Sequence, residues 1–98
     1  MAQSARSKKA DLINSSWLGK PGRRHNFQAL VFYVGTYQRN SVYQHIMKDR
    51  DGNIIVYSAP KRLAGTMTRL HFSARVIKHR LYKGIRQTLV TDLKLETR

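Results

Sequence analysis

Aromatic and basic residues are crowded together in a short stretch near the C-terminal end of the chain, from His79 to Arg86. Tyr82 stands in a predicted turn, with Arg80, Lys83 and Arg86 close to it. An exposed ring can stack on an unpaired base, at about 1–3 kcal/mol per base, while neighbouring cations contact the phosphates. The other interpretation is that Tyr82 folds back over the end of the fold and covers its core. The basic neighbours favour stacking.

A second candidate platform lies in the middle of the chain. Tyr43 and His45 have the spacing that puts them on one face of a strand, and Tyr57 would lie across the hairpin from them. Each of these alone could equally belong to the core or the rim. Trp17 could dock onto the fold or stack on a base, and the sequence does not choose. Core packing is expected instead for the aromatic residues in strongly apolar runs, Phe27, Phe32, Tyr33 and Phe72.

Several basic residues flank the predicted strands or leave the polar face of one, and they are the expected phosphate contacts. They are Arg23, Arg24, Lys61, Arg62, Arg75, Lys78 and Lys83. The predicted binding set also takes in the rings of Trp17, Tyr43, His45, Tyr57 and Tyr82, and the residues His79, Arg80 and Arg86. Any single one of these cations could equally be a solvated surface residue.

The overall charge agrees with a polyanionic partner. The 98 residues carry 19 Lys and Arg against 5 Asp and Glu, a formal net charge of +14. This exceeds what solubility requires and predicts nucleic acid as the partner. A ribosomal or other assembly protein that neutralises RNA would show the same charge. Cysteine is absent, which excludes disulfides, zinc knuckles and thiol catalysis and favours an intracellular setting.

The carboxylates are too few and too scattered for an acid and base pair, so we expect no catalysis. They are Asp11, Asp49, Asp51, Asp92 and Glu96. Asp49 and Asp51 fit turn formation, and the four histidines lack the spacing of metal ligands. The segment Gly19 to Gly22 lacks the spacing and the Lys-Ser/Thr pair of a phosphate-binding loop. The sequence therefore predicts a binding protein without a metal or cofactor.

Five predicted strands must position these side chains. Asp51-Gly52 is a tight-turn signal between two of them, and Pro60 to Gly65 allows one helical turn at most. The five short runs, with no long helix, predict an all-β barrel or small sandwich, and an SH3-like barrel stays possible on the pattern alone. The runs are 27–34, 42–47, 54–57, 70–77 and 85–95.

The chain divides into a tail and one domain. Residues 1–16 are rich in Ser, Ala, Lys and Arg and are expected to form a flexible basic arm, with the folded domain over 17–98. No apolar run approaches the roughly 20 residues of a membrane span, so we expect no membrane partner. The expected location is the cytoplasm, the nucleoid or an infected host cell. A homo-oligomer is possible, because dimer surfaces and base-stacking surfaces look alike in sequence.

Three motifs in order resemble a family of small phage and bacterial single-stranded-DNA-binding domains with the oligonucleotide/oligosaccharide-binding (OB) fold. The family's last hairpin has His, two residues, Tyr-(Lys/Arg)-Gly, two residues and Gln-Thr, matched here from His79 to Thr88. GKPGRR from Gly19 to Arg24 resembles its entry to strand one, and DRDGN from Asp49 to Asn53 resembles its Asp-x-Asp-Gly-Asn hairpin before strand three. Together the motifs span nearly the whole predicted domain.

This resemblance implies a five-stranded OB barrel with a very short or absent helix between strands three and four. It implies binding of single-stranded DNA with little sequence preference, in replication, recombination or packaging. The chain departs from the family pattern at Tyr57 (usually Trp), Ala74 (Gly), Ile77 (Lys) and Asp92 (basic). It ends in Lys94-Leu95-Glu96-Thr97-Arg98 rather than an acidic tail, so tail-mediated recruitment is not predicted.

Two other functions remain open on the sequence. One is an RNA-binding or ribosome-associated OB protein, whose basic residues would be permanent RNA contacts. The other is a small docking subunit of a replication complex, in which Trp17 or a strand edge would contact a protein.

Overall fold

The computed structural model describes residues 15–37 and 42–96. Most of the expected basic arm, residues 1–14, therefore lies outside the described residues. Five strands contain the five predicted runs, and most extend beyond them. They are β1 (Arg24–Tyr37), β2 (Val42–Lys48), β3 (Ile54–Ala59), β4 (Thr68–Tyr82) and β5 (Ile85–Leu95).

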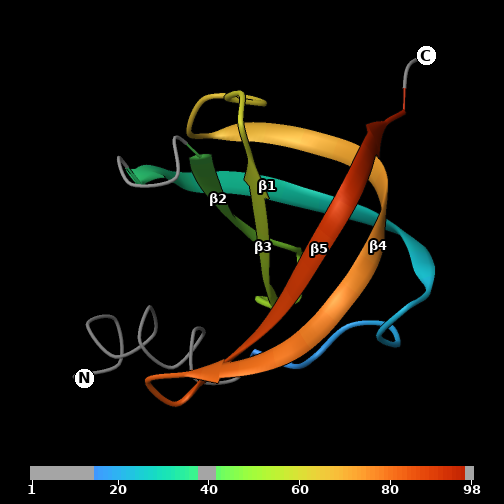
Figure 1. Ribbon diagram of the computed structural model, residues 1–98. Helices are drawn as coiled ribbons and strands as arrows, with labels where there is room; N and C mark the ends of the chain where they lie inside the picture. The colour runs from blue at the N-terminus through green and yellow to red at the C-terminus, as the bar shows by residue number, and fades with distance from the viewer. Residues whose placement is uncertain (1–14, 38–41, 97–98) are drawn as a thin grey trace.

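The strands form one closed barrel in the order β1-β2-β3-β5-β4, and β4 returns to pair with β1 (Figure 1). The β3–β5 pair is parallel and the other pairs are antiparallel. Residues 60–67, between β3 and β4, contain no helix. The prediction of an all-β, five-stranded, OB-like barrel without a substantial helix is confirmed. Nowhere in the described ranges is there a helix long and apolar enough to cross a membrane.

Alternate side chains of the strands fill the barrel interior, as a two-residue period requires. Phe27 and Phe72 are cross-strand partners whose rings stack with centroids 5.4 Å apart. Val31, Met47 and Ile55 pack in the same cluster and are fully buried. The core prediction for Phe27 and Phe72 is confirmed, and these two rings join β1 to β4 where the barrel closes.

A bulge in β1 shifts the register against β2 between Val31 and Tyr33. One extra residue exchanges the inner and outer faces of the strand, so Tyr33 points out and is 56% exposed. Phe32, at the bulge, is 36% exposed. The expectation that both rings belong to the core is therefore wrong. The Tyr33 ring lies over Gly35, where a Cβ would come within 3.0 Å of it.

The two phenylalanines at positions 72 and 32 give a matched stability test. Phe72→Ala is expected to lower the free energy of unfolding by about 3–5 kcal/mol, because it leaves a cavity in the closed core. Phe32→Ala should cost clearly less, since that ring is partly in water. Urea unfolding followed by circular dichroism measures both. Equal losses would show that Phe32 packs inside and that the bulge is absent.

Candidate nucleic-acid interface

The β4–β5 hairpin extends past the beginning of β1, because β1 starts at Arg24 and pairs with β4 only as far as Arg75 (Figure 1). Tyr82 pairs with Ile85, and Lys83 and Gly84 form the two-residue turn. Both turn residues have positive φ, 50° and 81°, the conformation that a tight hairpin turn requires and that Gly84 adopts without strain. The turn holds Tyr82 at the tip, where it is 50% exposed.

Trp17 covers one face of this hairpin. Its ring stacks on His79 with centroids 5.5 Å apart and planes 10° apart. The Arg86 guanidinium lies 5.2 Å from the centre of the same ring, and the indole Nε1 donates to the Arg80 carbonyl at 3.1 Å. Trp17 nevertheless remains 42% exposed. The two interpretations left open for Trp17 are thus compatible, since it docks onto the hairpin and keeps ring surface free.

Tyr82 and Arg80 occupy the opposite face, because side chains alternate along β4. The Arg80 guanidinium and the Lys83 ammonium lie 5.6 and 5.4 Å from the centre of the Tyr82 ring. Arg80 is held by Gln87, whose Oε1 accepts from its Nε at 3.0 Å and its Nη2 at 2.6 Å. An arginine has five N–H donors, so this contact orients the guanidinium and leaves donors for a phosphate.

The segment before β1 fixes this hairpin to the barrel. The Ser15 hydroxyl donates to the Arg86 carbonyl at 2.6 Å and accepts from the Ile54 amide at 2.8 Å. The Leu18 amide donates to the buried Thr88 hydroxyl at 2.8 Å, and the Leu18 carbonyl contacts Nε2 of His79 at 3.1 Å. Ser15 is fully buried, so barrel contacts include at least two residues before the predicted domain boundary at residue 17.

Six predicted site residues therefore lie together, and we call them the hairpin cluster. They are Trp17, His79, Arg80, Tyr82, Lys83 and Arg86. The cations lie against ring faces, and no carboxylate of residues 15–37 or 42–96 forms an ion pair with them. Such a surface can stack bases on two rings and place positive charge beside them for phosphates.

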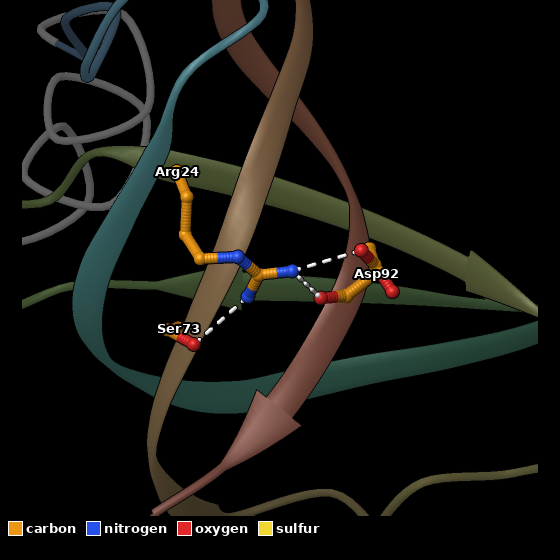
Figure 2. Close-up of polar contacts among 3 residues, drawn as sticks. All are labelled: Arg24, Ser73 and Asp92. Carbon is orange, nitrogen blue, oxygen red and sulfur yellow. Dashed lines mark hydrogen bonds and ion pairs between the residues drawn. The ribbon is translucent and has the colours of Figure 1, made fainter.

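Arg24 is not available in the same way. Its Nη2 donates to the Asp92 carboxylate at 2.9 Å and to the Asp92 carbonyl at 2.8 Å, and its Nη1 donates to the Ser73 hydroxyl at 2.8 Å (Figure 2). Three acceptors thus hold one guanidinium between β1, β4 and β5. Asp92 is the position where the resembled family has a basic residue, and here it neutralises Arg24. Arg24 is thus engaged within the barrel, and its role as a phosphate contact stays a prediction.

The remaining predicted cations are exposed but spread out. Arg23 precedes β1. Arg75 and Lys78 lie on β4, where its register against β5 shifts between Val76 and Lys78. Lys61 and Arg62 lie in the connection 60–67, which leads into the start of β4, whereas the hairpin cluster lies at its end. The structure does not bring Lys61 and Arg62 to the hairpin cluster.

The predicted platform of Tyr43, His45 and Tyr57 faces inward. His45 is fully buried, with Nδ1 at 3.1 Å from the Tyr57 carbonyl and Nε2 accepting from the Leu63 amide at 2.9 Å. Tyr57 is half-buried against the core, and Tyr43, opposite Ala59 on the neighbouring strand β2, is half-buried too. His45 is thus a structural residue that ties the connection 60–67 to the barrel. Its assignment to an exposed platform is wrong.

Tyr33 is the more exposed of the two β1 rings, Phe32 and Tyr33, that were wrongly expected in the core. The apolar run around it hid the bulge that turns it outward. Its one sequence signal is Gly35, two residues further on the same face, which leaves room for the ring. Tyr33 offers a stacking surface outside the hairpin cluster.

The acidic residues have mainly structural contacts. Oδ1 of Asp49 accepts from the amides of Asp51 and Asn53 at 2.9 and 2.8 Å, and Oδ2 accepts from Asn53 Nδ2 at 3.0 Å. Asp49 is therefore used by the turn, as predicted, whereas Asp51 contributes its backbone. Within residues 15–37 and 42–96, no group of three or more His, Asp and Glu could hold a metal ion.

Comparison with known proteins finds no matching family model, no matching curated protein and no matching solved structure.

The buried role of His45 can be tested directly. His45→Ala is expected to lower the free energy of unfolding by about 1–3 kcal/mol, because the Leu63 amide loses its acceptor. His71→Ala removes an exposed histidine and should change stability by about 0.5 kcal/mol or less. Thermal or urea unfolding measures both variants. A stable His45→Ala protein with weakened nucleic-acid binding would return His45 to the interface.

Proposed function

We propose that this protein binds single-stranded nucleic acid through the hairpin cluster, without a chemical step. The observation that carries the proposal is the contact of cations with two half-exposed rings, Trp17 and Tyr82, on one projecting hairpin. Unpaired bases offer faces to such rings, whereas the bases of a duplex are already stacked on each other. A narrow hairpin with rings on both faces therefore suits a flexible single strand.

DNA is the proposed strand, and this part rests on the resemblance of His79–Thr88, Gly19–Arg24 and Asp49–Asn53 to the single-stranded-DNA-binding family. Stacking does not depend on base identity, which supports binding with little sequence preference. The proposed setting is DNA replication or recombination inside a cell. RNA would meet the same rings and cations, so the comparison of DNA with RNA belongs in the test.

Trp17 gives the binding test its own signal, because it is the single tryptophan of the chain and lies in the hairpin cluster. Oligo-dT is expected to change its fluorescence in a saturable way and to bind more tightly than duplex DNA. If about four to six phosphates are neutralised, log affinity should fall against log salt with a slope of about −3 to −4. Tighter binding to matched RNA would make this an RNA-binding protein. A flat salt dependence, or equal binding to duplex, would overturn the proposal.

Tyr82→Ala is expected to weaken oligo-dT binding by the loss of one stacked base, about 1–3 kcal/mol, or roughly 5- to 150-fold in Kd. Its side chain is exposed, so stability should barely change. Met67→Ala is the control, because Met67 is 74% exposed and immediately precedes β4, at the opposite end of that strand from Tyr82. The same titration with Trp17 fluorescence serves all three proteins. Equal affinities of the Tyr82→Ala and control variants would show that Tyr82 does not stack.

A further inference from the structure

A hollow of about 510 Å³ lies over the outer face of β1 and the first part of β4, beside the end of β2. Gln28 and Leu30 of β1 face His71 and Arg69 of β4 as cross-strand pairs and form its floor. Lys48 and the turn residues that follow it form the remaining wall. Its volume is in the range that a nucleotide-sized ligand occupies.

The walls of this hollow are predominantly cationic. Arg50, Arg69 and His71 are exposed, and within the part of the chain that the structure describes no hydrogen bond or ion pair engages their side chains. Asp49 also lines the hollow; neutral amides of the turn donate to both its carboxylate oxygens, which orients the carboxylate but leaves its negative charge in place. Glu96 lies beside His71, where its amide donates to the His71 carbonyl, but does not line the hollow. Two free guanidinium groups are thus available to an anion.

A second hollow of about 430 Å³ adjoins the first and extends along the first residues of β1. The two hollows share Gln28, Asp49 and Arg50. The second one reaches Leu18, the chain neighbour of Trp17. It also contains the exposed carboxylate of Asp51, which would repel a phosphate. The two adjoining hollows therefore form a track from Leu18, the residue after Trp17, past Arg50 to Arg69.

We propose that this track, here called the β1 groove, is a second binding site for the phosphate backbone of the same nucleic-acid strand. This proposal rests on the proposed function. It adds the path that the bound strand follows and a dependence of affinity on the length of that strand. A short strand occupies the hairpin cluster alone. A longer strand continues along the β1 groove, where Arg50 and Arg69 contact its phosphates and Gln28 offers an amide. None of these three residues belongs to the set predicted from the sequence.

The test compares oligo-dT of about 4 and about 12 nucleotides, within the span of site sizes seen for one OB fold. Wild type should bind the longer strand more tightly. The double variant Arg50→Ala/Arg69→Ala should lose about tenfold in affinity for the 12-mer, and its salt slope should fall by about 1.4, the value for two phosphate contacts. Its affinity for the 4-mer should stay within about twofold of wild type. Anisotropy of labelled strands measures all of these.

Lys20→Ala/Lys94→Ala is the matched control, because it removes the same charge from two exposed residues that line neither hollow and are outside the predicted binding set. It should leave the length dependence unchanged. Asp51→Asn keeps the Asx-Gly turn and removes the repelling carboxylate, so it should tighten 12-mer binding by about twofold while leaving the 4-mer alone.

The outcomes separate the two proposals. If the groove variant and the control weaken the 12-mer equally, or the groove variant weakens both lengths equally, the β1 groove is refuted while the hairpin cluster stands. If Tyr82→Ala has no effect on either length, the hairpin cluster is refuted instead. If wild type binds neither strand, the proposed function itself fails. Amide shifts in NMR at Arg50 and Arg69 with the 12-mer, and not with the 4-mer, would support the path directly.

Discussion

Strand β4 has two neighbours that it meets along different parts of its length, and the rest of the structure depends on this double pairing. It bonds to β1 from Thr68 to Arg75 and to β5 from Phe72 to Tyr82, so only a short central part has partners on both sides. That central part contains Phe72 and closes the barrel. Beyond Arg75 the strand continues with β5 alone, which produces a projecting hairpin.

A two-stranded hairpin without further support is only marginally stable in water. The segment before β1 supplies the support that β1 itself does not. Trp17 covers one face of the hairpin, and Ser15 and Leu18 bond to Arg86 and Thr88 on β5. The same contacts orient the rings and cations of the hairpin cluster. The support of the hairpin and the geometry of the candidate site therefore come from one short stretch of chain.

The strands could be predicted from the sequence because their period and turn signals are local. Which side chains face the core could not be predicted in the same way, because one bulge in β1 exchanges the inner and outer faces of that strand. At Tyr33 a single extra residue in β1 turns an apolar ring outward, and at His45 a half-polar strand puts a histidine inside, where the Leu63 amide completes its hydrogen bonds. The β2 residues opposite the bulge at Tyr33 and the Leu63 amide that bonds to His45 are both distant in sequence from these side chains. The same holds for Arg24 and Asp92, which are 68 residues apart. The hairpin cluster was predictable because all its members except Trp17 are consecutive or nearly so.

The distribution of carboxylates decides which of the many cations can meet a phosphate. With a net charge of +14 most basic residues have no acidic partner, so position matters more than number. Asp92 fixes Arg24 between three strands, and Asp49 is used by its own turn. The cations left beside hollows or rings are those of the hairpin, of the turn after β2 and of the start of β4. A strand that contacts both regions, as proposed, has to follow the surface of a small barrel. A flexible single strand can do this, whereas a duplex with a persistence length of about 150 base pairs cannot bend at this scale.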